Sequence, residues 1–471
     1  MMKKSLLKNK KILFIGGANG KDDWMMSISK ELERRQGITS FYLGILPGSK
    51  EYFLREGIPE DRVYSVWYVN QKKIVKPDIN FIRRSETKYN FKLWDIWQIT
   101  APRKKFYLNS KSNTILCWAE YLVREMENLV KNVKPDYVVM YAVVGYNMVI
   151  MHNVLKENGV EILMLVNARI PARFTFNNNL EDKWPLLIEE YNKIKKRKLL
   201  EKEIKFAENF FNNFRDNPFK PDDSARPKVP LSKKIEKYKL YLQIFKYRKK
   251  LPDLRQFMWP VLDKLKDMSG IFEMPVKGEK YVFYPLHINP EASTSLFGKW
   301  YVNQLDLIEK ISKSLPCDYK LYAKEHVFAY SSRPSWYYKE IKKFPNVRLI
   351  SPHTNTLDLI KNSSLVLTIT STVGWESILL QKPVLVFGDV YYNIFDGIIK
   401  IKEISQLPNL IENNLNKKID KNEIFKFIIA LFNSTFEGIG TDPGDNFAAL
   451  ESKNVSLLVD GIEKYIDHIK K

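Results

Sequence analysis

Residues 364–392 constrain the fold most, because strand and helix signals alternate within this short stretch. Leu365–Ile369 is a β-branched and apolar run, which predicts a buried strand. An apolar helix of about two turns is expected to begin at Gly374 and to end before Pro383, and Val384–Phe387 predicts a second buried strand. This order of elements is typical of a parallel α/β sheet.

The turn between this strand and this helix is rich in hydroxyl side chains, at Thr368, Thr370, Ser371 and Thr372. Free backbone N–H groups at a helix N-terminus favour an anion, and ligands bind at the carboxyl ends of strands in open α/β sheets. The turn from Thr370 to Gly374 therefore predicts a phosphate or diphosphate site. The alternative is that the hydroxyl groups only cap the helix, and the turn alone does not decide between the two.

The same alternation continues on both sides of this stretch and predicts two doubly wound α/β domains, as a chain of 471 residues also favours. In the second half, strands are expected at Tyr281–Pro285, Tyr319–Ala323 and Val347–Ile350, and helices at Gln304–Ser314, Trp336–Lys343 and Leu357–Lys361. In the first half, strands are expected at Lys11–Ile15, Ile38–Leu46, Tyr137–Val144 and Glu161–Val166, and helices at Asp22–Arg35, Ser112–Asn132 and Asn147–Glu157. The segment 167–179 is expected to be a loop.

We therefore predict four regions along the chain. The first Rossmann-like domain takes residues 1–179, a basic helical insertion takes 180–275, the second Rossmann-like domain takes 276–420, and closing helices take 421–471. The expected closing helices are Lys421–Phe432 and Asn446–Ile469.

A glycine-rich turn, GGANG at Gly16–Gly20, follows the first expected strand. It lacks the full G-x-G-x-x-G spacing, so a nicotinamide cofactor is not expected. The glycines are explained more simply as a tight connection from strand to helix. Asp22 and Asp23 follow this turn and are candidate N-caps of the next helix.

The segment 193–250 carries 19 Lys and Arg against 7 Asp and Glu, which is more than half of the formal net charge of +22. Aromatic residues are interleaved with these charges, as in helices that lie on an anionic membrane surface. The favoured alternative is a solvated insertion that packs its aromatic residues onto the first domain. Nucleic acid is not an expected partner, because no zinc-finger, helix-turn-helix or RNA-binding signature occurs.

The two cysteines, Cys117 and Cys317, match no metal spacing and favour a reducing compartment. The chain start resembles no signal peptide, and no apolar stretch reaches the length of about 18 residues that a membrane helix needs. We expect a cytoplasmic protein, and contact of 193–250 with the inner face of the cell membrane is the alternative to a solvated insertion.

Polar residues follow three expected strands of the second domain, and the carboxyl ends of parallel strands meet at one edge of a sheet. These residues are His287, Ser293, Thr294, Ser295, Lys324, Glu325, His326 and the segment 370–376. A lysine, a histidine and a hydroxyl-rich helix N-terminus supply the charge and the donors that a nucleotide phosphate needs, and Glu376 suits a ribose hydroxyl. His326 alone is better explained as a core or surface histidine. Three polar strand ends together favour a nucleotide site.

The stretch 281–392 resembles the capsule polysaccharide biosynthesis family, which includes the Kdo transferases of capsule export systems. That family carries K-x-H-P after one strand and S-T-x-G-x-E-(A/S) after another, followed by K-P-V and F-G-x-x-F/Y-Y. The matching residues here are Lys324–His326, Ser371–Ser377, Lys382–Val384 and Phe387–Tyr392. Val327 stands where the family has proline. Bacterial sialyltransferases are similar in using a His-Pro and a Ser/Thr element to hold CMP.

The resemblance implies a GT-B glycosyltransferase, in which two Rossmann-like domains face a cleft and His326, Ser371 and Thr372 contact the donor phosphate. The expected reaction moves a sugar from a nucleotide-activated donor, with a CMP-Kdo-like donor favoured, to a surface or capsular glycan. The second domain is expected to hold the donor and the first domain the acceptor.

Catalysis is expected to be metal-independent, because no D-x-D motif lies near the strand ends, and to need no cofactor besides the donor. Asp22 and Asp23 are the best-placed candidates for the catalytic base, with His326 at the donor phosphate. The alternatives are a nucleotide-sugar epimerase of the same architecture and a non-catalytic GT-B-like binding protein, which Val327 favours.

Overall fold

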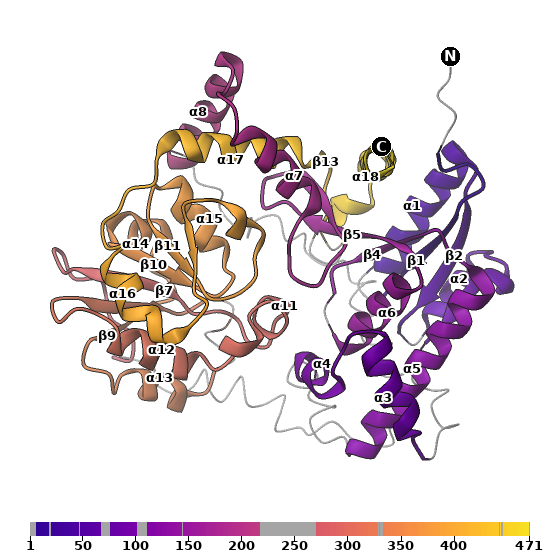
Figure 1. Ribbon diagram of the computed structural model, residues 1–471, viewed down its shortest axis with the longest axis horizontal. Coiled ribbons are helices and arrows are strands. Elements are labelled where there is room, and N and C mark those ends of the chain that lie inside the picture. Colours follow the sequence, from indigo (N-terminus) through magenta and orange to yellow (C-terminus); the bar gives the residue numbers. More distant parts are fainter. Residues whose placement is uncertain are drawn as a thin grey trace.

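The computed structural model describes residues 6–17, 20–46, 48–66, 76–100, 111–143, 145–216, 270–327, 329, 333–441, 443 and 446–470. In these ranges the chain forms two α/β domains, each built on a mainly parallel sheet (Figure 1). Counted along each domain, both sheets have the strand order 3-2-1-4-5-6 of doubly wound, Rossmann-like folds. The predicted fold class is confirmed.

The N-terminal sheet has its first strand at the centre and recruits its last strand from the far end of the chain. Its strands are β1 (Lys11–Ile15), β2 (Thr39–Gly44), β3 (Val63–Ser65), β4 (Tyr137–Tyr141), β5 (Glu161–Asn167), β6 (Arg173–Asn177) and β13 (Phe436–Glu437). β6 pairs antiparallel with both β5 and β13. The expectation of a loop over 167–179 is therefore wrong, because Phe174 and Phe176 are fully buried in a short strand.

Helices cover both faces of this sheet. One face packs against α1 (Lys21–Gln36), α2 (Ser49–Arg55) and α18 (Ser452–Ile469), and the other against α3 (Ile79–Lys88), α4 (Leu93–Thr100), α5 (Ser112–Val133) and α6 (Tyr146–Glu157). α1 shows why these segments are helical, since Trp24, Ile28 and Leu32 recur at four-residue spacing and form a fully buried stripe.

The C-terminal sheet has six parallel strands. They are β7 (Tyr281–Pro285), β8 (Lys320–Lys324), β9 (Val347–Ile350), β10 (Leu365–Thr368), β11 (Val384–Val386) and β12 (Ile398–Lys400). Neighbouring residues such as Val282 and Phe283 point to opposite faces, and both are fully buried. Burial on both faces explains why these strands are continuous apolar runs in the sequence.

The helices of this domain also lie on both sides of the sheet. α12 (Gln304–Lys313), α13 (Ser335–Ile341) and α16 (Leu407–Glu412) cover one face, and α14 (Thr356–Asn362), α15 (Thr372–Leu379) and α17 (Lys421–Asn433) cover the other. The short helix α11 (Ala292–Ser295) follows β7 and lies next to α4 of the first domain (Figure 1).

The described part of the basic insertion forms α7 (Pro185–Ile194) and α8 (Glu201–Asp216), which pack on α17. Phe211 and Phe214 are buried, and the ring of Phe211 lies 5.8 Å from that of Phe425 on α17. The expectation that these aromatic residues pack on the first domain is wrong. The chain has already crossed to the second domain at Trp184, whose indole stacks on Tyr391 at 4.1 Å.

The closing residues divide between the domains. α17 packs within the C-terminal domain, whereas β13 joins the N-terminal sheet and α18 packs on α1. The last helix begins at Ser452, after a short 3₁₀ turn at Phe447–Leu450, and so is shorter than expected.

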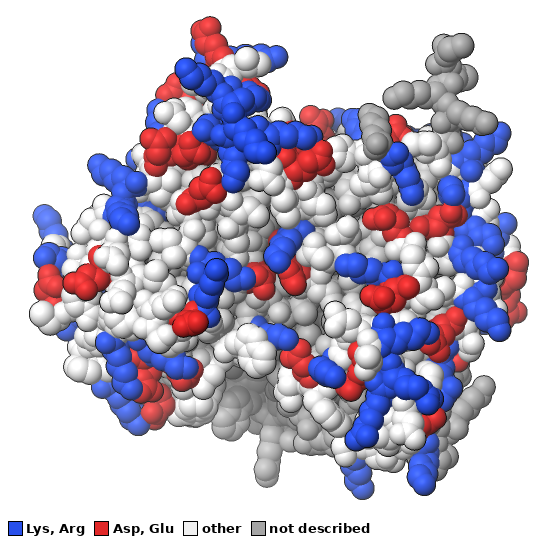
Figure 2. Space-filling model, viewed as in Figure 1, with Lys and Arg blue, Asp and Glu red and all other residues white. Residues whose placement is uncertain are grey.

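Lys and Arg side chains gather over α7 and α8, with Asp and Glu side chains among them (Figure 2). Residues 217–250 of the segment expected to contact a membrane lie outside the described residues. That contact stays a prediction. Within the described ranges, no helix combines the length and the hydropathy of a membrane span.

Candidate functional site

The order of strands in the C-terminal sheet brings the three polar strand ends together. β7 lies between β10 and β8, and all three strands are parallel. The segments after Pro285, Lys324 and Thr368 therefore leave the same edge side by side. The chain reverses its winding between β7 and β10, which is where open α/β sheets bind their ligands.

A side chain within the turn from β10 into α15 caps the helix that follows. Ser371 is the N-cap, and its Oγ accepts the N–H of Val373 at 3.2 Å. The exposed Thr372 follows, and neither its backbone N–H nor its hydroxyl has a hydrogen-bond partner among the described residues. Ser371 therefore caps the helix, as the alternative interpretation expected, while Thr372 is exposed beside it, and a phosphate at this turn stays a prediction.

Gly374 of the second motif has a steric role. A Cβ at this position would lie 2.2 Å from the hydroxyl oxygen of Tyr392, so only glycine fits. The Tyr392 hydroxyl donates to the carbonyl oxygen of Ser371 at 2.5 Å. Tyr392, the last residue of the matched motifs, therefore stabilises the turn that carries the Ser371–Ser377 motif.

His287 connects the end of β7 to the same turn. Its Nε2 accepts the N–H of Thr370 at 3.2 Å and lies 3.2 Å from the hydroxyl of Thr368. Burial lowers the pKa of His287 to about 3, with Arg333 and His326 adding to the effect, so the ring is neutral at physiological pH. An Nε2 that accepts a hydrogen bond places the remaining proton on Nδ1.

Lys324 and Glu376 form the polar floor of the site. Lys324 is 7% exposed, and its Nζ donates to the carbonyl oxygen of Pro352 at 3.0 Å. Burial raises the pKa of the Glu376 carboxyl to about 7, and the charge of Lys324 opposes this rise. Among the described residues, the Glu376 carboxylate has no hydrogen-bond partner. A buried carboxylate with a raised pKa and no partner is a candidate ligand-binding group.

An ion pair supports the segment after β8. The fully buried carboxylate of Glu325 lies 2.8 Å from Nε of Arg333, and it accepts the N–H of His326 at 2.5 Å. Arg333 also donates to the carbonyl oxygen of His287. His326 itself is half-buried, and burial lowers its pKa below the usual range. The loop thus keeps His326 at the strand edge with valine, rather than proline, at position 327.

The hydroxyl cluster after β7 is less open than the sequence suggests. Thr294 has no exposed surface, and its hydroxyl is used inside α11, where it forms a capping box with Glu291. Ser293 donates to the Glu291 carboxylate at 2.7 Å. This geometry gives no support to Thr294 as a nucleotide contact, because the capping role already occupies it.

Asp22 and Asp23 lie in the first turn of α1, after the carboxyl end of β1 in the other domain, so the expectation that they cap this helix is wrong: its N-cap is Gly20. The Asp22 carboxylate accepts the N–H of Gly17 at 2.9 Å and the hydroxyl of Ser49 at 2.8 Å. Burial raises the pKa of Asp22 to about 6. A Cβ on Gly16 would lie 1.9 Å from this carboxylate, so a glycine of the turn makes room for it. Asp23 accepts a hydrogen bond from Tyr52.

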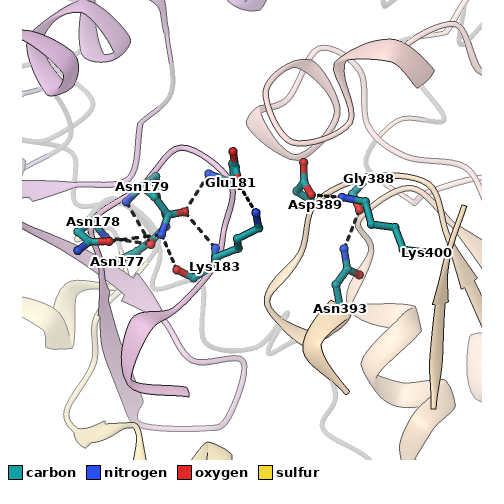
Figure 3. Close-up of polar contacts among 9 residues, drawn as sticks. All are labelled: Asn177, Asn178, Asn179, Glu181, Lys183, Gly388, Asp389, Asn393 and Lys400. Carbon is teal, nitrogen blue, oxygen red and sulfur yellow. Dashed lines mark hydrogen bonds and ion pairs between the residues drawn. The ribbon is translucent and has the colours of Figure 1, made fainter. Parts of the chain in front are cut away.

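Local hydrogen bonds shape the segment that joins the two domains (Figure 3). Nδ2 of Asn177 donates to the carbonyl oxygen of Asn179 at 2.9 Å, and Oδ1 of Asn179 accepts the N–H of Lys183 at 3.2 Å. In the C-terminal domain, Asp389 forms an ion pair with Lys400. The hydrogen bond to Glu181 raises the pKa of Lys183, and the charge of Asp389 makes a smaller contribution from the other domain.

The structure adds residues that the sequence did not single out. Arg333, Gln304 and Tyr392 fix the loops of the site, and only Tyr392 belongs to a recognised motif. A single arginine in a loop, or a glutamine at the start of a helix, gives no pattern from which its partner can be inferred. Among the described residues, no group of three or more His, Cys, Asp and Glu side chains is placed to hold a metal ion.

Comparison with known sequences agrees with the motifs. Residues 275–432 match the family of capsule polysaccharide biosynthesis proteins. Protein FixF of Sinorhizobium fredii (strain NBRC 101917 / NGR234) is 29% identical over 132 residues, which are 27% of this chain and 31% of FixF. The match therefore spans about a third of that relative.

Solved structures that match this chain include the β-Kdo 2,7 transferase of Thermosulfurimonas dismutans KpsC, at a TM-score of 0.39 and 16% identity over 79% of this chain and 97% of that one. The UDP-GlcNAc 2-epimerase from Neisseria meningitidis bound to UDP-GlcNAc has a TM-score of 0.28 and 14% identity over 89% and 98% of the two chains. Because the family match contains every motif residue from Lys324 to Tyr392, the predicted resemblance to the capsule polysaccharide biosynthesis family is confirmed for the C-terminal domain.

Proposed function

We propose that this chain is a glycosyltransferase that moves a sugar from a nucleotide-activated donor to a surface or capsular glycan. The observation that carries the proposal is the open N-terminus of α15 at the point where the sheet winding reverses, with Glu376 one turn further along. The α15 dipole and the free N–H of Thr372 suit a phosphate, and an unpaired carboxylate beside them suits a ribose hydroxyl.

The residues around this turn can stabilise a leaving nucleotide. Lys324 and His326 lie at the carboxyl end of β8, which reaches the same edge of the sheet beyond β7, and positive charge or hydrogen-bond donors there stabilise the negative charge that develops on the departing phosphate. Nζ of Lys324 is already hydrogen-bonded to the carbonyl oxygen of Pro352. Its charge therefore acts on the phosphate through space and not through a direct hydrogen bond. The family resemblance favours a CMP-activated sugar acid of the Kdo type as the donor, and a glycan as the acceptor.

Thermal unfolding with and without CMP, UDP and GDP tests the donor site, because a ligand that binds only the folded state raises its stability. We expect one nucleotide to raise the unfolding temperature of the wild type. We expect His326→Ala to reduce that shift. His468→Ala, on α18 of the other domain, is the matched control and should leave it unchanged. No shift with any nucleotide would contradict a donor site.

A second assay separates transfer from epimerisation. Donor is incubated with and without a capsular oligosaccharide, and the products are separated by chromatography and identified by NMR spectroscopy, because epimeric nucleotide sugars have the same mass. A glycosylated acceptor supports the proposal. A new nucleotide sugar formed without acceptor would instead support an epimerase of the same architecture.

The proposed base is Asp22, since burial keeps its pKa near 6 and only its ionised form accepts a proton. The transfer rate kcat is expected to rise with pH through about 6 in the wild type. Asp22→Asn is expected to reduce kcat by about 100-fold and to abolish this rise. Asp23→Asn is the neighbouring control, and an unchanged kcat in both variants and in the double variant would rule out the assignment.

A further inference from the structure

A cavity of about 470 Å³ opens next to the donor site. Its walls come from the segment after β7, the start of α12, and the segment that leads into α13. The lining residues are Asn289, Lys299, Trp300, Val302, Asn303, Gln304, Arg333 and Tyr337. None of the motif residues lines it. Gln304 and Arg333 both hold the backbone of His287, so the cavity and the donor site share one wall.

Trp300 is the most exposed large apolar side chain in the described part of the molecule, at 82%. Its indole is nevertheless supported. Nζ of Lys299 lies 5.1 Å from the ring centroid and forms an ion pair with Asp95 on α4 at 2.6 Å. An aromatic ring that is supported on one side and open at the mouth of a cavity is suited to stack on a ligand.

Polar groups with unused hydrogen-bonding capacity lie around this ring. The Tyr337 hydroxyl is buried and has no hydrogen-bond partner among the described residues. Asn303 uses only its Oδ1, as the N-cap of α12, which leaves its amide N–H groups as donors. Asn289 uses only its Nδ2, which donates to the carbonyl oxygen of Val302, so its Oδ1 can accept. A ligand with several hydroxyl groups satisfies such a mixed set.

The charges of the lining are already balanced. Lys299 pairs with Asp95, and Arg333, which is nine-tenths buried, pairs with Glu325. None of the described residues that line the cavity carries a carboxylate. A phosphate or a carboxylate entering here would have to compete with these partners, whereas an uncharged ligand would not.

We propose that this cavity binds an uncharged pyranose unit of the glycan acceptor. The C–H groups of one pyranose face stack on the indole of Trp300, and its hydroxyl groups bond to Tyr337, Asn303 and Asn289. The assignment of the sugar to an acceptor rests on the proposed transferase function. The position fits, because the Lys299–Asp95 ion pair places the cavity mouth against α4 of the acceptor domain.

Saturation-transfer NMR on the full chain tests the proposal with the methyl glycosides of glucose, galactose, mannose, rhamnose and N-acetylglucosamine. At least one glycoside is expected to bind the wild type. Its affinity is expected to fall about fivefold or more in Trp300→Ala and also to fall in Tyr337→Phe. Trp336→Ala is the matched control, because Trp336 is also exposed, at 57%, but does not line the cavity.

Three results would overturn the proposal. They are no binding of any glycoside, equal losses in Trp300→Ala and Trp336→Ala, and tighter binding of methyl glucuronide than of methyl glucoside. Thermal shifts with CMP, UDP and GDP are expected to be the same in Trp300→Ala and in the wild type. A nucleotide shift lost in Trp300→Ala would identify a nucleoside pocket instead. Glycoside binding without any nucleotide shift would leave the sugar site standing and contradict the donor site.

Discussion

Arg333→Met is expected to lower the free energy of unfolding by about 3–5 kcal/mol, because it leaves the carboxylate of Glu325 buried without its counter-ion. Glu325 has no exposed surface, and its Oε2 lies 2.8 Å from the Arg333 guanidinium. Burial already raises the pKa of Glu325, and Arg333 opposes that rise. The substitution also removes the hydrogen bond to the carbonyl oxygen of His287. The midpoint and slope of urea unfolding measure the loss.

Two controls separate the buried charge from the rest of the side chain. In Arg333→Met/Glu325→Gln the stranded charge is gone, so this double variant is expected to be more stable than Arg333→Met alone. Lys310→Met breaks an exposed ion pair with Asp306 and should cost less than about 1 kcal/mol. Equal losses in Arg333→Met and Lys310→Met would show that the buried pair has no special role.

Glu376→Gln is expected to stabilise the protein at pH 8 and to weaken nucleotide binding at the same time. The folded-state pKa of Glu376, about 7, lies above its ordinary value of 4.5. Ionisation therefore opposes folding, and the stability of the wild type falls as pH rises from 4.5 to 7. Glutamine is neutral throughout and avoids a cost of up to about 3 kcal/mol. The charge of Lys324 reduces this cost, and the buried hydroxyls of Tyr391 and Tyr392 also interact electrostatically with Glu376.

The unfolding temperatures of the wild type and Glu376→Gln should therefore coincide at about pH 4, below both pKa values of the carboxyl, and diverge at pH 8. Nucleotide affinity at pH 8 should fall about tenfold in the variant, since a hydrogen bond to a charged carboxylate is stronger than one to an amide. Near pH 5 the wild type is itself protonated and the difference in affinity should shrink. A variant that is no more stable than the wild type at pH 8 would contradict the raised pKa of Glu376.

Local sequence predicted the strands of the C-terminal sheet closely. Tyr281–Pro285 and Val347–Ile350 have the expected bounds, because strands buried on both faces are continuous apolar runs. β6 was missed, because Arg173–Asn177 is short, carries polar residues, and pairs with Phe436–Glu437 from the other end of the chain. No local pattern reports such a distant partner.

The candidate site divides in the same way. The sequence by itself indicated the turn from Thr370 to Glu376, because a hydroxyl cap at a helix N-terminus has a local cause, whereas Gly374 is required by the Tyr392 hydroxyl, which only the folded chain brings there. Only the tertiary structure decided which groups surround that turn. His287 reaches Thr370, and Arg333 reaches Glu325 and His287, because the strand order places β7 between β10 and β8. The cavity that Trp300 lines likewise exists only because the segments after β7 and β8 meet in the folded protein. These contacts join residues far apart in the chain, and the strand order that creates them is a property of the whole sheet.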